Sequence, residues 1–231
     1  MVHSLVSKFN YDPIERETRD DGVRFYIDPV HKIKLPSITT VLSRTGDHSG
    51  IEAWANYIGK KKADIIRDEA AGIGSILHEH LENYLLNIPR PDGDNLVYRI
   101  AKKLSDSMIQ NGLLKITEVY GIEAPLYLDN LCAGTSDLIA SYDGEISILD
   151  FKNSRKIKKE EHLQDYFAQL AAYALCHDQM FGTSINQGVI LMVNRDAEFK
   201  EFIVQGDEFE SHKIKFLERL DHFHQYIMET L

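Results

Sequence analysis

The stretch GTSDLIASYDGEISILDFKNS, residues 134–154, holds two runs of apolar and β-branched residues joined by Asp143-Gly144. An Asp-Gly pair between such runs predicts a β-hairpin with a two-residue turn. Cross-strand partners then have residue numbers that sum to 287, which places Asp137 opposite Asp150. Directly opposed like charges destabilise a sheet by up to about 1 kcal/mol. The pair therefore needs a positively charged partner.

A lysine lies next to this carboxylate pair. Side chains alternate along a strand, so Asp150 and Lys152 share one face of the hairpin with Asp137. Ile148 and Leu149 make both faces of the second strand apolar, as in a central strand of a covered sheet. A solvated hairpin face with an ion pair is the alternative. Lys152 compensates one buried carboxylate, whereas Mg²⁺ or Mn²⁺ would compensate both. The hairpin therefore predicts a metal site.

The composition fits an intracellular globular protein. The chain has 231 residues, 43% of them hydrophobic, and a formal net charge of −10. That charge argues against a protein that coats nucleic acid through bulk charge, although a local basic patch remains compatible with it. The two cysteines, Cys132 and Cys176, are predicted to be buried thiols. No signal peptide and no apolar run long enough for a membrane span is evident, so we expect a cytoplasmic location.

The order of predicted elements indicates a mixed α/β (α+β) domain, with a central mixed sheet flanked by helices. An N-terminal hairpin and helical segment (1–112) precedes a core (113–231), and we expect the two to form one compact unit. The predicted elements are a hairpin within 23–35, helices at 37–46, 50–67, 70–87 and 93–111, strands at 115–128, 131–142 and 145–152, a helix at 159–180, strands at 188–194 and 198–205, and a helix at 207–229.

The spacing of the charged residues resembles that of a known nuclease superfamily. Asp137, twelve intervening residues and then Asp150-x-Lys152 resemble the core motif of the PD-(D/E)XK nucleases. Gln169-x-x-x-Tyr173 resembles the QxxxY motif of the RecB-like branch, and its i, i+4 spacing puts both side chains on one helix face. His78 lies in an upstream helix, as the histidine ligand of that branch does. Glu123 precedes the first aspartate by one strand, as an acidic residue often does there.

Within that branch, the layout is most similar to the mitochondrial genome maintenance exonuclease and its phage relatives. The similarity covers about residues 35–228 and includes PSITTVL (36–42), GIGSILHEHLE (72–82) and QLAAYA (169–174). It implies a restriction-endonuclease-like core and a metal-dependent exonuclease that hydrolyses phosphodiester bonds from free ends of single-stranded DNA, in replication, repair or recombination. The absence of an Arg- and Ser-rich leader favours a phage or bacterial source, with the host cytoplasm as location for a phage protein.

The resemblance also implies roles for individual residues. The implied ligands of one or two Mg²⁺ or Mn²⁺ ions are His78, Asp137, Asp150, the backbone carbonyl of Phe151 and, as an additional candidate, Glu123. Lys152 would orient or deprotonate the attacking water, and near bound metal its pKa is expected to be lowered. Gln169 and Tyr173 would fix the water or the scissile phosphate. Each residue also has an ordinary structural reading: a surface histidine, a strand carboxylate, or a buried polar group.

Basic residues near these motifs are candidates for DNA contacts. Ser154 and the run RKIKK lie directly after the motif lysine, and KKK (60–62) lies upstream. The candidates are Ser154, Arg155, Lys156, Lys158, Lys159, Lys60 and Lys61. A charge run is more often a solvated face. Trp54, Tyr57 and Phe167 could stack on unpaired bases, but we expect them in the core.

Three other functions fit part of the pattern. The same core could belong to a structure-specific or sequence-specific endonuclease, which dependence on a free end would distinguish. A catalytically inactive nucleic-acid-binding or scaffold protein would keep the fold, although the complete Asp–Asp–Lys set argues against it. A metal-binding protein of another chemistry would need a second ligand cluster, such as Cys-x-x-Cys, which the sequence lacks.

Overall fold

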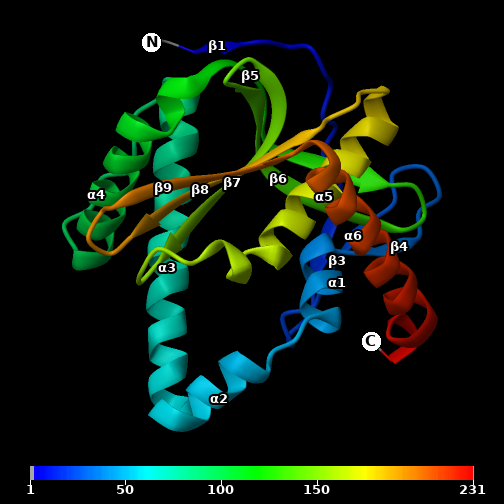
Figure 1. Cartoon of the computed structure of the whole chain (residues 1–231), viewed down its shortest axis with the longest axis horizontal. Coiled ribbons are helices and arrows are strands. Elements are labelled where there is room, and N and C mark those ends of the chain that lie inside the picture. The colour runs from blue at the N-terminus through cyan, green and yellow to red at the C-terminus, as the bar shows by residue number, and fades with distance from the viewer. Residues whose placement is uncertain (1–2, 231) are drawn as a thin grey trace.

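The computed structural model describes residues 3–230, which fold around a six-stranded mixed sheet (Figure 1). The strand order is β1-β5-β6-β7-β8-β9. The pairs β1·β5 and β7·β8 are parallel, and the other neighbours are antiparallel. The strands are β1 (Ser4–Leu5), β5 (Ile116–Leu128), β6 (Cys132–Tyr142), β7 (Glu145–Ser154), β8 (Gln187–Asn194) and β9 (Phe199–Gln205). The predicted mixed α/β class with a central mixed sheet is confirmed.

Helices cover both faces of this sheet. In Figure 1, α3 and α4 lie on one side of it and α1, α5 and α6 on the other. The helices are α1 (Ile38–Thr45), α2 (Ser49–Ile58), α3 (Lys60–Leu85), α4 (Leu96–Asn111), α5 (Gln164–Phe181) and α6 (Gly206–Tyr226), with short 3₁₀ turns at Leu113–Lys115, Glu160–His162 and Met228–Thr230. No helix within the described residues is long and apolar enough to cross a membrane.

A separate three-stranded antiparallel sheet precedes α1. It consists of β2 (Arg16–Thr18), β3 (Arg24–Ile27) and β4 (Lys34–Pro36). The predicted hairpin corresponds to β3 and β4, whereas β2 was not predicted because three exposed residues carry no periodic pattern. Ser37 caps α1 as expected, since its hydroxyl accepts a hydrogen bond from the Thr40 amide at 3.0 Å.

The central hairpin has the predicted turn and register. Asp143 and Gly144 have φ angles of 50° and 90°, as a type I′ turn requires. The paired residues run from Tyr142–Glu145 to Leu138–Leu149, and each pair sums to 287. The ladder ends there, so the backbone pairing of Asp137 with Asp150 does not form. Beyond this point β6 stays paired with β5 and β7 with β8, and the two strands of the hairpin separate.

Two predicted helices have different boundaries. We expected a break between 67 and 70, but α3 runs continuously from Lys60 to Leu85. The break lies at Gly59, whose φ of 89° is readily adopted only by glycine. The residues around position 68 are ordinary helix formers without proline, so nothing interrupts the helix there. The helix predicted over 159–180 begins as a 3₁₀ turn and becomes α5 at Gln164.

Two apolar layers hold the sheet. Ile148 packs in the layer beneath α1, α5 and α6, whereas Leu149 and Phe151 pack in the layer beneath α3 and α4. Both faces of β7 are therefore covered, as predicted for a central strand. Cys132 and Cys176 are buried free thiols, as expected. The division at residue 112 stays a prediction, although α3 and α4 share their apolar layer with the sheet.

Candidate active site

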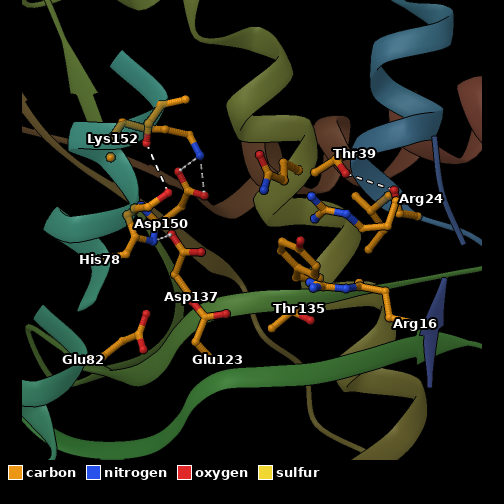
Figure 2. Close-up of a pocket in the computed structure, with 18 of the residues that line it drawn as sticks. Arg16, Arg24, Thr39, His78, Glu82, Glu123, Thr135, Asp137, Asp150 and Lys152 are labelled. Atoms are coloured by element: carbon orange, nitrogen blue, oxygen red, sulfur yellow. Dashed lines mark hydrogen bonds and ion pairs between the residues drawn. The ribbon is translucent and has the colours of Figure 1, made fainter. Parts of the chain in front are cut away.

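A cavity of about 560 Å³ opens where β6 and β7 separate, between α3 and α5 (Figure 2). Residues predicted from sequence line it from five elements: α3, β5, the two hairpin strands β6 and β7, and α5. These residues are His78, Glu123, Asp137, Asp150, Lys152, Gln169 and Tyr173. The structure thus brings together side chains that are up to about a hundred positions apart in the sequence.

Helix α3 approaches β7 closely enough to deliver His78 to this cavity. A Cβ at Gly74 would lie 3.0 Å from Asn153 Oδ1, so a glycine allows the close approach. Asn153 Nδ2 donates a hydrogen bond to the carbonyl of Ala70 at 3.3 Å. His78 lies one helical turn after Gly74 on the same face of α3.

Asp137 and His78 meet at the backbone of Phe151. Asp137 Oδ2 accepts a hydrogen bond from the Phe151 N–H at 2.9 Å, in place of the hairpin pairing that is missing at this point. The same oxygen lies 3.6 Å from His78 Nδ1. His78 Nε2 is 3.0 Å from the Phe151 carbonyl oxygen. The motif aspartate, the helix histidine and the predicted carbonyl ligand therefore lie within one small group.

This group has the donor set of a metal site. His78, Glu123 and Asp137 each offer a ligand atom, and these atoms lie within 4.8 Å of one another. Nitrogen and carboxylate oxygen donors suit Mn²⁺ and Mg²⁺. Adjacent ligands of an octahedral ion with bonds of about 2.1 Å are separated by about 3.0 Å. In the protein alone, His78 Nε2 and the Phe151 carbonyl oxygen are instead joined by a hydrogen bond of 3.0 Å, which a cation bound by both would replace.

Buried Asp150 and half-buried Lys152 form an ion pair beside this group. Lys152 Nζ donates to Asp150 Oδ1 at 2.7 Å and lies 2.6 Å from Oδ2. Oδ2 is buried and accepts no well-directed hydrogen bond, so the adjacent Lys152 ammonium is the charge that compensates it in the protein alone. Burial, opposed by Lys152 but reinforced by Asp137, raises the pKa of Asp150 to about 6.

The pKa of Lys152 is raised in the protein without metal. We predicted a lowered value near bound metal. In the protein alone, burial does lower the pKa of Lys152, but the attraction of Asp150 and Asp137 outweighs it and the net shift is upward. Burial is the main cause of the raised pKa of Asp150, whereas the two nearby carboxylates raise the pKa of Lys152. Lys152 is therefore a cation in the protein alone, and its role beside bound metal stays a prediction.

Glu123 and Glu82 add two further carboxyl groups. Burial together with the charges of Asp137 and Glu82 raises the pKa of Glu123 to about 8. Burial also raises the pKa of Glu82, with His78 opposing the shift. Glu123 has a φ of 46°, a left-handed conformation that is uncommon for a non-glycine residue and often occurs at functional sites. The raised pKa values show that the clustered carboxylates repel one another and retain protons. A cation that replaces those protons would relieve the repulsion.

Gln169 and Tyr173 line the same cavity from α5. Tyr173 is buried, and burial raises its pKa well above the usual value despite a hydrogen bond with Gln169. The ring fits because residue 134 is a glycine: a Cβ there would lie 2.8 Å from Tyr173 Cε1 and 3.1 Å from its hydroxyl. The pattern Gly134-Thr-Ser-Asp137 thus combines close packing on the ring with a candidate ligand.

The predicted basic contacts lie at varying distances from the cavity. Ser154, Arg155 and Lys156 line a neighbouring cavity that shares Ala70 and Asn153 with the first. The Ser154 hydroxyl donates to the Lys156 carbonyl at 2.6 Å, so it closes a turn.

Four other predicted lysines do not reach the cavity. Lys158 Nζ donates to the Tyr166 hydroxyl at 2.8 Å, and Lys159 lies 3.6 Å from exposed Glu161. Lys60 and Lys61 begin α3, about 27 Å from His78 at 1.5 Å per residue. These lysines therefore stay candidates only for DNA outside the cavity.

Several side chains outside this cluster bear on the expectations from sequence. A second histidine of α3, His80, is buried and its Nδ1 accepts a hydrogen bond from Arg90; of the two, His78 lines the cavity. Phe167 is in the core as expected. Trp54 and Tyr57 are not: they are 41% and 88% exposed on α2. The core expectation failed because α2 packs mainly against α3 and buries none of its own residues.

Sequence reasoning missed three charged residues that line the cavity: Glu82, Arg16 and Arg24. Glu82 had a usable signal, because it follows His78 by four residues on the same helix face. Arg16 and Arg24 had none, since their sheet reaches the cavity only through tertiary packing.

Comparison with solved structures supports the fold. A 2.19 Å crystal structure from Eubacterium rectale, named "Putative exonuclease", aligns with a TM-score of 0.51 and 13% identity. The alignment covers 69% of this chain and 66%, just under two thirds, of that one. The protein SSO0001 aligns over 87% of this chain and 81% of its own with 15% identity, but a TM-score of 0.44 is too low to indicate a shared fold. No family model and no curated protein sequence matches the chain.

Proposed function

We propose that this protein is a divalent-metal-dependent deoxyribonuclease that hydrolyses phosphodiester bonds. The observation that carries the proposal is a single cavity in which ligand atoms of His78, Asp137 and Glu123 lie within 4.8 Å of one another, beside the Asp150–Lys152 ion pair. Carboxylates that bind metal and a lysine that offsets phosphate charge are the groups this hydrolysis needs. The fold shared with the Eubacterium rectale protein agrees with the proposal.

His78, Asp137 and the Asp150 carboxylate would hold Mg²⁺ or Mn²⁺, with Glu123 and the Phe151 carbonyl completing the ligands. When bound, the cation supplies charge that lowers the pKa of the attacking water and stabilises the leaving oxygen. Glu123 would give up the proton that its raised pKa retains near neutral pH.

The remaining groups position the reactants. Lys152, held by Asp150, would donate hydrogen bonds to the attacking water or to the phosphate and offset the charge that develops there. Tyr173 and Gln169 face the same cavity and would orient the scissile phosphate.

We further propose an exonuclease that acts on free ends of single-stranded DNA during replication, repair or recombination, in a phage or bacterial setting. The similarity to the RecB-like branch suggests this substrate. In Figure 1, α2 and the first half of α3 extend away from the sheet. Trp54 and Tyr57 are exposed there next to Lys60 and Lys61, which is a surface suited to stack on and bind a single strand. These helices would form a clamp over the strand.

A gel assay of linear and circular single-stranded DNA tests the proposal. Wild type and Lys152→Ala are compared in Mg²⁺, in Mn²⁺ and in EDTA, with circular dichroism as the check on folding. Metal-dependent loss of the linear strand alone, absent in the variant, supports the exonuclease. Cleavage of both forms indicates an endonuclease that uses the same site. Binding without cleavage in any metal would indicate a nucleic-acid-binding protein and refute the proposed chemistry.

A further inference from the structure

The wall of the cavity opposite the carboxylates is positively charged. Arg16 on β2 and Arg24 on β3 both line the cavity. Figure 2 shows their side chains on the far side from His78 and Asp150, with Thr135 and Thr39 between and beside them. The three-stranded sheet thus contributes cations to a site whose carboxylates come from the main sheet and α3.

Within residues 3–230, the guanidinium groups of Arg16 and Arg24 have no ion pair and no side-chain hydrogen bond to the protein. Lys34 on the same small sheet differs, since its Nζ lies 2.7 Å from Glu17. Arg16 is close enough to the carboxylates that its charge acts to lower the pKa of Glu123. Two cations that face a cavity in this way indicate an anionic ligand.

We propose that Arg16 and Arg24 form a phosphate subsite that binds a phosphate of the DNA strand next to the one being hydrolysed. This inference rests on the proposed function. Guanidinium groups match phosphate oxygens in a bidentate manner, which makes arginine suited to fix a strand in register. The cavity of about 560 Å³ falls within the range that encloses a nucleotide-sized ligand.

The bound phosphate has two chemical sources, a terminal phosphate or an internal phosphate of the backbone. Arg24 and Thr39 also line an adjoining cavity of about 310 Å³, together with Arg44 and His48. Further basic groups therefore continue beyond the subsite, which would let a longer strand pass through. Both kinds of phosphate would bind to the same arginines, so they are distinguished by comparing strands with and without a terminal phosphate.

The test compares Arg16→Gln, Arg24→Gln and the double variant with wild type. Lys34→Gln is the matched control, because it removes a positive charge from the same sheet outside the cavity. Linear single strands carry a 5′-phosphate, a 3′-phosphate or hydroxyls at both ends. Steady-state KM is measured in Mn²⁺, and binding is measured by fluorescence anisotropy in EDTA over a range of salt concentrations. Thermal melts confirm folding, which the arginine substitutions are expected to leave unchanged.

We expect each single arginine variant to raise KM about tenfold, since a charge-assisted hydrogen bond to phosphate contributes that much or more. The slope of log affinity against log salt should become shallower by about 0.7 for each phosphate that is no longer neutralised. If the arginine variants weaken binding only of strands that end in a phosphate, the subsite binds a terminal phosphate. If they weaken binding of all strands equally, it binds an internal phosphate of the backbone. Variants that match Lys34→Gln in KM and in salt slope overturn the subsite. If wild type cleaves nothing, the proposed function fails, and anisotropy still decides whether the arginines bind DNA phosphate.

Discussion

Gly134→Ala should destabilise the protein through a clash with Tyr173. An alanine Cβ would lie 2.8 Å from Tyr173 Cε1 and 3.1 Å from its hydroxyl. Carbon atoms pack best at about 3.5–4.0 Å, so the ring must move by roughly 0.7–1.2 Å. Tyr173 is 3% exposed within the core, which leaves it little room to move. Overpacking of this kind costs about 1–3 kcal/mol.

The size of the effect sets the assay. In a chain of this length each kcal/mol moves the melting temperature by about 2–4 °C, so we expect a drop of roughly 2–12 °C by circular dichroism. Gly72→Ala is the matched control, because nothing lies within 4 Å of its added Cβ and the residue is inside α3. That variant should gain about 0.5–1 kcal/mol from its better helix propensity.

Tyr173 can be tested as the cause. Tyr173→Leu in the Gly134→Ala background should recover part of the loss, giving a coupling free energy of about 1 kcal/mol in a double-mutant cycle. DNA cleavage by Gly134→Ala should fall more than its folded fraction does, since the ring that faces the cavity is displaced. Equal melting temperatures for the two alanine variants, or strictly additive effects in the cycle, would refute this packing.

Four further results are expected. Lys152→Ala leaves Asp150 buried without its cation, so the pKa of Asp150 rises further above 6. A carboxyl group with a raised pKa in the folded protein destabilises it increasingly as pH rises. Urea unfolding should therefore show that the variant loses more unfolding free energy, relative to wild type, at pH 8 than at pH 5. Glu123→Gln should make the metal-free protein more stable near pH 8 and reduce the change of its unfolding free energy between about pH 5 and 8. Solvent exposure of this side chain makes the effect smaller, and unchanged melting curves would argue against the raised pKa. Mn²⁺ at a hundredfold excess over Kd should add about 2.7 kcal/mol to the unfolding free energy of wild type, and an equal gain in Asp137→Asn would place the ion elsewhere. Gln169→Ala should lower cleavage while leaving the melting temperature within a few degrees of wild type, and full activity would remove it from the site.

The central hairpin was predictable because its signals are local. The Asp143-Gly144 turn fixes the register, and alternation fixes which side chains share a face. The same reasoning could not foresee where the ladder would end. Separation of the strands after Leu138–Leu149 lets the Asp137 carboxylate bind the Phe151 amide, and this depends on how β7 pairs with β8.

The rest of the candidate site depends on tertiary packing. His78 and the QxxxY residues were found through the family resemblance, because neither lies near the hairpin in sequence. Arg16 and Arg24 were missed because β2 and β3 carry no motif and reach the cavity only when the small sheet packs beside β6. The raised pKa of Lys152 in the protein alone could not be predicted, because its sign depends on the balance between burial and two nearby carboxylates.

The most direct test of the proposed metal centre is anomalous diffraction from a crystal of the wild-type protein soaked in Mn²⁺. We predict an anomalous peak bonded to His78 and Asp137, at the point where Glu123, Asp150 and the Phe151 carbonyl converge. A fully soaked crystal with no peak in this cavity, or with Mn²⁺ bound only at surface carboxylates elsewhere, would contradict the assignment of this cluster as a metal-dependent nuclease site.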